Sequence, residues 1–197
     1  ADVAIFSAHK FMGSLTAGIL AGKKKYIKNI YLQNLGIGRG MKVGKEAIYA
    51  AIIGVENWYK RDWKKEIENQ NNILQYWLRF LALQKFNGIT YEVVADPTGN
   101  KINRLRIYVN EKKSNFTIQS LSYHLEKNNP AIFVRDDLIH FNHFELDTCN
   151  LKKDQEKIVM NEFKKIISKL KSKKIKHNMS QKEYLNKSKK EWLSWLD

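Results

Sequence analysis

The fold and function of this chain depend on the stretch Val3-Ala-Ile-Phe-Ser7-Ala-His9-Lys10-Phe-Met-Gly13. The apolar run from Val3 to Phe6 predicts a buried strand, and the residues after it form a segment punctuated by glycines. Lys10 follows directly at the end of this strand. Apolar surroundings there would disfavour its ammonium form, so that a free amine able to attack a carbonyl group becomes accessible near neutral pH. The alternative is an ordinary surface lysine that follows a strand.

A glycine-rich basic segment lies a short distance further along the chain. It reads Leu32-Gln-Asn-Leu-Gly-Ile-Gly-Arg39-Gly-Met-Lys42-Val-Gly-Lys45-Glu46. The glycines allow backbone amides to approach an anion closely, and Arg39, Lys42 and Lys45 supply three cations around them. The segment therefore predicts an anion-binding loop. The alternative is a flexible loop with a solvated basic face.

Together, the two segments resemble fold type I pyridoxal 5′-phosphate enzymes. Ser7-x-His9-Lys10, followed by Gly13 and Thr16-Ala-Gly-Ile-Leu-Ala-Gly22, is similar to the segment that carries their cofactor lysine. The basic segment is similar to the signature of the selenocysteine synthase-like group, closest to its D-glucosaminate-6-phosphate ammonia lyase branch. The resemblance is close from residue 1 to about residue 60 and extends, in pattern only, to about residue 170.

The resemblance implies a role for each residue of the first segment. Lys10 would hold pyridoxal 5′-phosphate covalently, and it would act as the base that removes the α-proton once the substrate has released it. The pyridine ring would accept the electrons. Ser7 and His9 would lie near the cofactor phosphate.

The resemblance also assigns cationic residues to substrate binding. Arg39 and Lys42, together with Lys45, would hold a phosphate or carboxylate group of a phosphorylated small-molecule substrate. Arg135, in Pro130-Ala-Ile-Phe-Val-Arg135, matches a small-domain strand of these families and would hold a substrate carboxylate. A surface ion pair is the alternative for Arg135. Because such basic loops serve an active site at a subunit interface, a homo-oligomer is implied.

The implied activity is that of a lyase that eliminates ammonia or water from a phosphorylated amino-sugar acid. Fold type I enzymes are longer than these 197 residues, so the chain resembles the last part of a large domain plus a small domain. The half that it lacks carries most of the cofactor cradle, and we therefore expect the chain to be inactive by itself. The alternatives are a selenocysteine synthase-type transferase acting on seryl-tRNA, and a non-catalytic remnant that serves oligomerisation or polyanion binding.

Charge and composition limit the other classes of function. The formal net charge is +15, which would ordinarily point to nucleic acid. However, residues 152–197 hold fourteen lysines against six acids and so account for +8 of it. Nucleic acid is therefore not the expected partner, except for tRNA if the chain is a transferase. The longest apolar run, residues 47–55, is shorter than the ~18 residues that span a bilayer, so no membrane partner is expected.

Cysteine and histidine usage argues against a metal site. The single cysteine, Cys149, excludes an internal disulfide and a cysteine-rich zinc site, and it fits a reducing cytoplasm. His140 and His143 fall in a predicted strand, where they would point to opposite faces and could not share one ion. We therefore expect a cytoplasmic protein without a metal ion.

The remainder of the chain predicts helices followed by a second domain. Apolar residues at three- and four-residue steps from Lys42 to Phe86 predict one long helix, or two helices with a break within residues 62–72. The order strand, strand, helix, strand, strand, helix then predicts an α+β layer domain, its strands at 89–94, 103–109, 131–135 and 138–144 and its helices at 118–126 and 152–170. The predicted fold class is therefore α/β.

The expected division is 1–60 for the end of the large cofactor-binding domain, 61–86 for a connecting helix, 87–170 for the small domain, and 171–197 for a basic linker and an amphipathic helix.

Overall fold

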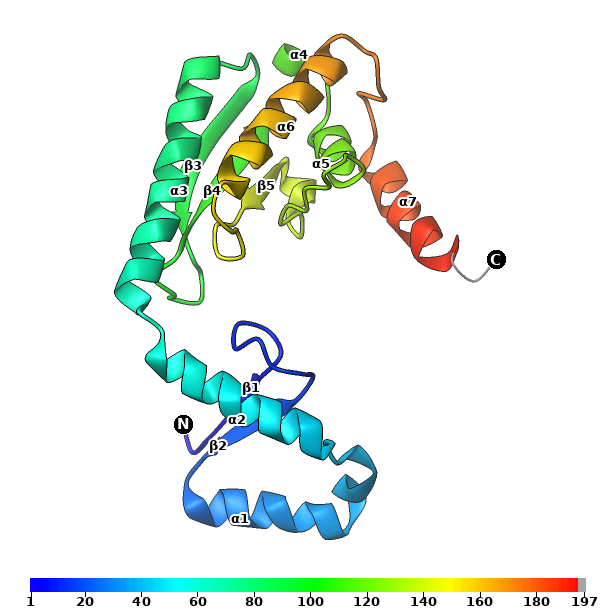
Figure 1. Cartoon of the computed structure of the whole chain (residues 1–197). Helices are drawn as coiled ribbons and strands as arrows, with labels where there is room; N and C mark the ends of the chain where they lie inside the picture. The colour runs from blue at the N-terminus through cyan, green and yellow to red at the C-terminus, as the bar shows by residue number, and fades with distance from the viewer. Residues whose placement is uncertain (195–197) are drawn as a thin grey trace. The chain divides into compact units, whose positions relative to one another are not determined.

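A computed structural model describes residues 1–194 of the chain. Its elements fall into two compact units, Ala1–Trp63 and the residues from Lys64 onward. Both units combine helices with antiparallel strands (Figure 1). The chain therefore has the mixed α/β fold that the sequence predicts, while the expected domain boundaries at residues 60, 86 and 170 stay predictions.

The first unit contains an antiparallel hairpin. Strand β1 (Val3–Ser7) pairs with β2 (Gly18–Gly22), and Val3 lies opposite Gly22. Glycine is required at position 22, because a Cβ there would lie 2.3 Å from the carbonyl oxygen of Asp2. The helices of this unit follow in the order α1 (Lys24–Leu32), the short 3-10 helices η1 (Gln33–Leu35) and η2 (Ile37–Met41), and α2 (Lys45–Lys60).

The prediction that the first strand is buried is wrong for this chain. Ile5 is 75% exposed, so no element of this unit covers its side chain on that face of the hairpin. Within residues 1–63, Ala8 and Gly54 are the only buried residues. Large apolar side chains are correspondingly open to solvent, among them Ile37 at 82% and Tyr59 at 84%. The first unit therefore presents an extensive apolar surface.

The long helical stretch is two helices. Helix α2 ends at Lys60 and α3 (Trp63–Gln84) begins three residues later, so the two-helix alternative is correct and the break lies at its predicted start. Leu74, Trp77 and Leu81 recur at three- and four-residue steps on α3, and they are buried in the core of the second unit. The predicted connecting helix thus contributes one wall of that core.

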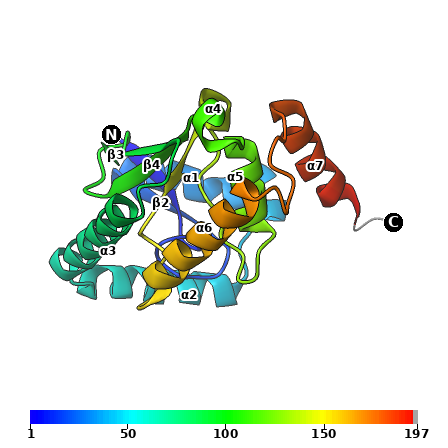
Figure 2. The same cartoon turned by 90° about the horizontal axis from the view of Figure 1, so that it is seen from above.

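A three-stranded antiparallel sheet forms the centre of the second unit. Its order is β3 (Ile89–Ala95), β4 (Asn103–Val109) and β5 (His143–Leu146). Leu105 and Ile107 of β4 are fully buried and pair with Leu146 and Phe144 of β5. Helices α3 and α6 (Gln155–Lys171) cover this apolar face of the sheet (Figure 2).

Helix α5 (Ile118–Glu126) begins where the sequence predicts it. The Thr117 side chain accepts a hydrogen bond from the Ser120 amide at 3.2 Å and so caps the helix. The segment before α7 (Gln181–Leu193) lies along α5, since the Thr117 hydroxyl donates to the Met179 carbonyl at 2.9 Å. The short helix α4 (Glu111–Ser114) precedes α5. Residues 195–197 of the predicted C-terminal helix lie outside the described residues.

Of the two strands predicted at 131–135 and 138–144, the first does not form and the second begins only at His143, where β5 starts. Arg135 makes a single bridge with Glu145, and residues 139–141 form the 3-10 helix η3 (Ile139–Phe141). A turn begins at Asp136, whose carbonyl accepts from the Ile139 amide at 2.9 Å, and Asn142 has φ 60, which interrupts an extended chain. His140 therefore lies in η3, and the argument that it shares a strand with His143 was wrong.

The second face of the sheet carries a buried ion network centred on Arg104. Because side chains alternate along β4, Arg104 and Arg106 point away from the apolar face. The Arg104 side chain is 10% exposed and pairs with Asp96, with Asp147 at 3.0 Å and with Glu145 at 3.7 Å. One buried guanidinium thus contacts three carboxylates, and Arg106 and Arg135 supply further positive charge to Glu145 and Asp147. None of the helices within residues 1–194 is both long and apolar enough to span a membrane.

Candidate functional site

Lys10 lies in an ordered loop between β1 and β2. The loop is closed at its base, where the Ala8 amide donates to the Ala17 carbonyl at 2.9 Å. A turn within it is completed by Gly13, which has φ +67 and whose amide donates to the Lys10 carbonyl at 3.1 Å. Ala8 is fully buried, whereas His9 and Lys10 are exposed. The loop therefore has a fixed base and presents two reactive side chains.

Helix α2 supports this loop through a close backbone approach. Gly54 is the only buried residue of α2. A Cβ at Gly54 would lie 3.2 Å from the carbonyl oxygen of Met12 and 3.4 Å from the Ser14 Cβ. Only glycine leaves the loop this close to the helix without displacing it. A glycine inside an apolar-periodic helix is the sequence signal that indicates such a contact.

Arg61 forms a second contact between α2 and the lysine loop. Its guanidinium donates to the carbonyl oxygen of Phe11, the residue after Lys10, at 3.2 Å. The guanidinium carbon lies 5.4 Å and 5.3 Å from the ring centroids of Trp58 and Trp63, within the range of cation–π attraction. The sequence alone did not identify Arg61 as part of the site, because its partner is 50 residues away.

The structure brings Ser7, His9 and Lys10 together in one short segment. Ser7 ends β1 and is half-buried, and His9 and Lys10 follow it. The apolar surroundings predicted for Lys10 are not provided by the first unit, because the Lys10 side chain is open to solvent. Within this chain, the amine of Lys10 is thus reachable by a small molecule.

The three cations of the basic segment gather at the beginning of α2. Arg39 lies in η2, Lys42 follows it, and Lys45 is the first residue of α2; all three are exposed. Gly44 caps the helix without a side-chain hydrogen bond, so no side chain caps the first backbone amides of α2, and Glu46 lies in the same turn. The predicted anion loop therefore coincides with a helix N-terminus.

The lysine loop and the basic segment meet α2 at different places. The basic segment leads into Lys45, whereas the lysine loop contacts Gly54 and Arg61. The nine residue-to-residue steps from Lys45 to Gly54 span about 14 Å along a helix axis. Within one chain, the predicted cofactor lysine and the predicted anion-binding residues therefore lie at separate parts of α2.

Arg135 belongs to the second unit. Its backbone exchanges two hydrogen bonds of 2.9 Å with Glu145, which fixes its position beside β5. The guanidinium lies 3.8 Å from Asp137 and 3.9 Å from Asp147, and the side chain is 43% exposed. The surface ion pairs that were the alternative role for Arg135 are therefore present. Both are long, and they leave the guanidinium accessible to a further anion.

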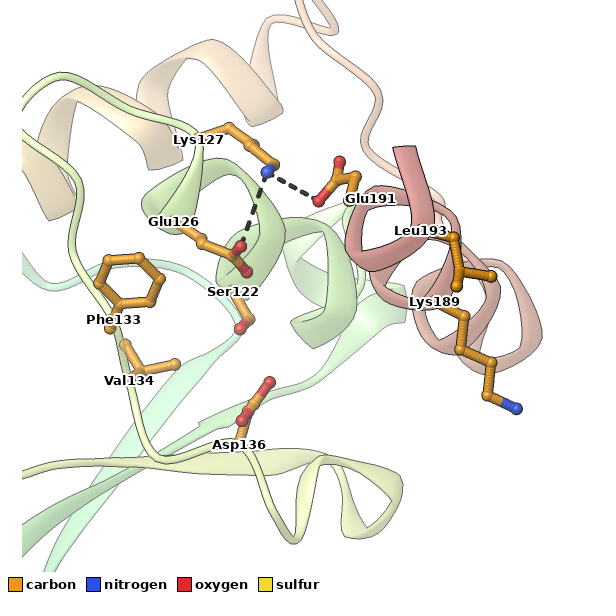
Figure 3. Close-up of a pocket in the computed structure, with 9 residues that line it drawn as sticks. All are labelled: Ser122, Glu126, Lys127, Phe133, Val134, Asp136, Lys189, Glu191 and Leu193. Carbon is orange, nitrogen blue, oxygen red and sulfur yellow. Dashed lines mark ion pairs between the residues drawn. The ribbon is translucent and has the colours of Figure 1, made fainter. Parts of the chain in front are cut away.

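A cavity of about 770 Å³ lies in the second unit between α5, residues 133–136 and α7 (Figure 3). A pair of 2.7 Å between Lys127 and Glu191 crosses its upper rim, while Asp136 lies at its base. None of the residues predicted from the sequence is among its described lining residues. Across residues 1–194, no group of three or more His, Cys, Asp or Glu side chains is arranged to hold a metal ion.

No protein-family model matches the chain. It is 25% identical over 166 residues to the D-glucosaminate-6-phosphate ammonia lyase of Salmonella typhimurium, which covers 84% of this chain and 43% of that protein. It is also 26% identical over 168 residues to a 5′-C-glycyluridine monooxygenase-decarboxylase of a Streptomyces species, over 85% of this chain and 41% of that protein.

A solved structure of D-glucosaminate-6-phosphate ammonia-lyase has the same fold over the matched region. The TM-score is 0.64 at 24% identity, and the match covers 85% of this chain and 44% of the other. The chain thus spans less than half the length of the relatives that it matches. Over more than four fifths of its own length it is similar in sequence and fold to D-glucosaminate-6-phosphate ammonia lyase, as its motif residues predict.

Proposed function

We propose that this chain is part of a pyridoxal 5′-phosphate-dependent lyase that eliminates ammonia or water from a phosphorylated amino-sugar acid. The observation that carries the proposal is the loop around Lys10. An exposed lysine stands on a loop with a buried base, in a chain similar over most of its length to D-glucosaminate-6-phosphate ammonia lyase. The similarity by itself covers less than half of that enzyme, and so the activity of the whole protein is part of the proposal.

The residues of the loop fit the proposed cofactor. The Lys10 amine is accessible to an aldehyde, and Ser7 and His9 next to it offer hydrogen-bond donors for a phosphate. When bound, pyridoxal 5′-phosphate supplies a ring that accepts electrons from the substrate carbon. Lys10 takes the proton from the carbon that bears the substrate amino group, and the loop contacts with Gly54 and Arg61 keep its backbone in place for that transfer.

The substrate class follows from what the two relatives have in common. By their names, one acts on an amino-sugar acid and the other on a glycyl derivative of a sugar nucleoside, and each of these carries an amino group next to a carboxyl carbon. We assign a substrate phosphate to Arg39, Lys42 and the α2 N-terminus, with Lys45 beside them, because these supply cations and free amides together. Arg135 is the proposed partner of the substrate carboxylate.

A homo-oligomer with the active site at the subunit interface is part of this proposal. The basic segment and the lysine loop contact α2 about 14 Å apart along its axis. In an oligomer, both groups can contact one substrate if the basic segment of one copy lies beside Lys10 of another copy. The exposed apolar surface of the first unit is proposed to be covered by polypeptide that completes the cofactor cradle, so the chain is inactive by itself.

A second candidate reaction is decarboxylation. It is favoured by the similarity to the Streptomyces monooxygenase-decarboxylase, which is as great as the similarity to the ammonia lyase. Both reactions begin at the carbon that bears the amino group. They differ in the bond that breaks. Release of ammonia from a 2-amino-2-deoxy sugar acid phosphate supports the lyase, whereas release of carbon dioxide from it supports the second candidate.

We expect Lys10→Ala to abolish covalent attachment of the cofactor. The chain is mixed with the part of the Salmonella lyase that it does not match, then with pyridoxal 5′-phosphate, and the visible absorbance of a lysine-bound cofactor is recorded. Borohydride reduction followed by peptide mass mapping should place the cofactor on Lys10. Lys28→Ala, which removes another exposed lysine of the first unit, serves as the control and should keep the absorbance.

Three outcomes contradict the proposal. If the cofactor maps to other lysines in the wild-type chain, or if Lys10→Ala keeps the absorbance, Lys10 is not the cofactor lysine. If no absorbance develops in a mixture that circular dichroism shows to be folded, the chain is a non-catalytic remnant.

A further inference from the structure

A cluster of lysines surrounds the C-terminal end of α6 in the second unit. From residue 163 to residue 182 the chain has eight lysines and no aspartate or glutamate. All eight are exposed: Lys164, Lys165, Lys169, Lys171, Lys173, Lys174, Lys176 and Lys182. Four of them, Lys169, Lys171, Lys173 and Lys174, lie at the very end of α6 and directly after it, and we call these four the basic tip.

Few negative charges offset the basic tip. On either side of it, Glu162 pairs with Lys165, and Glu183 pairs with Lys176 at 2.6 Å. Among the described residues, no carboxylate forms an ion pair with the four lysines of the tip itself. The negative end of the α6 dipole is equivalent to only about half an elementary charge. The tip therefore keeps most of its positive charge.

The backbone of the basic tip has a fixed conformation. The Lys173 amide donates to the Leu170 carbonyl at 3.0 Å, and the Lys174 amide donates to the Lys169 carbonyl at 3.0 Å. Lys173 has φ 55, in the left-handed region that commonly ends a helix. The lysines of the tip thus project from a folded helix end.

The segment that follows the basic tip is tied to α5. The ring nitrogen Nε2 of His124 donates to the Lys176 carbonyl at 2.9 Å. Met179 is 2% exposed, and its amide donates to the Ser120 hydroxyl at 2.9 Å. A flexible lysine-rich linker would spread its charge and would lose backbone freedom when it binds. Because this segment is already ordered, that cost is small here.

The positive potential of the tip extends toward α5 and α7. Burial is the main cause that lowers the pKa of His124, and the charges of Lys187 on α7 and Lys169 on α6 lower it further. The hydrogen bond to the Lys176 carbonyl opposes these effects. The imidazole of α5 therefore lies between cations that come from two other helices.

The side chains around the basic tip suit phosphate groups more than apolar or aromatic partners. Within residues 163–182, no large apolar side chain is exposed; Phe163, Ile166, Ile167 and Leu170 of α6 point into the core. A segment that binds a membrane surface presents apolar side chains that insert between lipids. A surface for single-stranded nucleic acid presents aromatic rings on which bases stack. Exposed lysines alone suit the phosphodiester backbone of a duplex.

We propose that the basic tip binds the phosphodiester backbone of a nucleic-acid duplex without reading its sequence. In the sequence alone, the concentration of charge in residues 152–197 argued against nucleic acid. The ordered path of this segment changes that conclusion, because it holds the charges together at one end of α6. The tip belongs to the second unit and binds independently of the lyase reaction, so the full-length chain without cofactor is the protein to test.

We expect the combined substitution Lys169→Gln, Lys171→Gln, Lys173→Gln and Lys174→Gln to weaken duplex binding. Affinity for short fluorescein-labelled DNA and RNA duplexes is measured by fluorescence anisotropy at about 50 to 200 mM salt. The variant should bind at least about tenfold more weakly at the lowest salt, and its slope of log affinity against log salt should be smaller by about three to four. The duplex that binds more tightly identifies the nucleic acid.

A matched control removes four exposed lysines from the first unit. It combines Lys24→Gln, Lys25→Gln, Lys28→Gln and Lys60→Gln, and so lowers the net charge by the same amount. The affinity and the salt slope should stay those of the wild type. Circular dichroism checks that both fourfold variants are folded.

Glu111→Gln should strengthen duplex binding, a result that loss of folding cannot produce. Glu111 of α4 is exposed and lines a small cavity together with Lys173 and His177, so its carboxylate repels a phosphate at the tip. Removing this charge should raise the affinity by about two- to fivefold. Glu56→Gln, which neutralises an exposed acid of α2, is the control and should leave the affinity unchanged.

Several results would overturn the proposal. Binding of neither duplex at the lowest salt would do so. Equal losses in the two fourfold variants would show that binding follows net charge and has no place on the surface. An unchanged affinity in Glu111→Gln would place the duplex away from Lys173. Vesicles of phosphatidylcholine and phosphatidylserine form a separate arm, and binding to these without binding to a duplex would assign the lysines to a membrane surface.

Discussion

Replacing Arg104 with methionine will lower the free energy of unfolding of the second unit by about 3–5 kcal/mol, because it leaves the buried carboxylate of Asp96 without a cation and removes one cation each from Glu145 and Asp147. The side chains of Asp96, Glu145 and Asp147 are 2%, 12% and 19% exposed. Methionine fills the volume of the arginine stem but cannot donate a hydrogen bond. Urea unfolding followed by circular dichroism measures the loss.

Arg106→Met is the matched control for this change. Arg106 lies two residues further along β4 on the same face and pairs with Glu145 at 2.8 Å, but its side chain is 25% exposed. Because solvent screens a partly exposed pair, we expect a loss of about 1 kcal/mol or less. Equal losses in the two variants would contradict the assignment of Arg104 as the centre of the network.

The same network makes the second unit sensitive to acid. Hydrogen bonds from Thr98 and Asn100 and the charge of Arg104 hold the pKa of Asp96 well below its usual range, although burial opposes them. Burial also opposes the hydrogen bonds from Cys149 and Arg104 that lower the pKa of Asp147. Since both pKa values are lower in the folded state, this contribution to stability is complete above the unfolded value of about 4 and is lost as pH falls below it.

The pH dependence gives a second readout for Arg104→Met. The hydrogen bonds from Thr98 and Asn100 to Asp96 remain in this variant, but the attraction between Arg104 and the ionised carboxylates is lost, and protonation relieves part of the damage. The difference in unfolding free energy between wild type and variant should therefore be largest near neutral pH and become smaller below pH 4. A constant difference across this range would show that the loss comes from packing and not from charge.

Replacing Gly88 with alanine will lower the free energy of unfolding by about 2–6 kcal/mol, the sum of backbone strain and overpacking. Gly88 has φ +78, which side chains rarely adopt. A Cβ there would lie 2.5 Å from the Ser114 amide nitrogen. The turn cannot move away easily, because the Gly88 carbonyl accepts from the Asn110 amide at 2.7 Å. Urea unfolding is again the measurement.

Gly99→Ala separates the two causes. Gly99 has nearly the same backbone conformation, with φ +79, but no atom lies within 4 Å of the position of a Cβ. Its replacement should therefore cost only the strain, about 1–3 kcal/mol. If Gly88→Ala costs no more than Gly99→Ala, the close approach to Ser114 is incorrect.

The sequence predicted those elements whose stabilising contacts join residues that are close together in the chain. The cap at Thr117 and the helix that follows it could be predicted because the cap and its amide are three residues apart. The pair β3 and β4 could be predicted because each strand alternates and a turn joins them. Residues 131–144 misled the prediction, since Ile132, Phe133 and Val134 favour a strand although the turn at Asp136 and the left-handed Asn142 prevent one.

In the candidate site, too, only the contacts between residues close together in the chain could be predicted. The loop of Lys10 could be predicted because its residues are contiguous, but the support from Gly54 and Arg61 could not, since it joins residues about 40 to 50 positions apart. The sequence also suggested that Lys10 is enclosed. An apolar run indicates a strand but does not say whether another layer of the same chain covers that strand.

The scarcity of buried residues in the first unit has a consequence for its motions. With only Ala8 and Gly54 buried within residues 1–63, little apolar area opposes local opening there, whereas the second unit has a continuous core. In hydrogen exchange, the amides of β1, β2 and α2 should therefore exchange while those of β4 and α6 remain protected. A polypeptide that covers the apolar surface should slow their exchange, because it opposes local opening of the unit that carries the lysine loop.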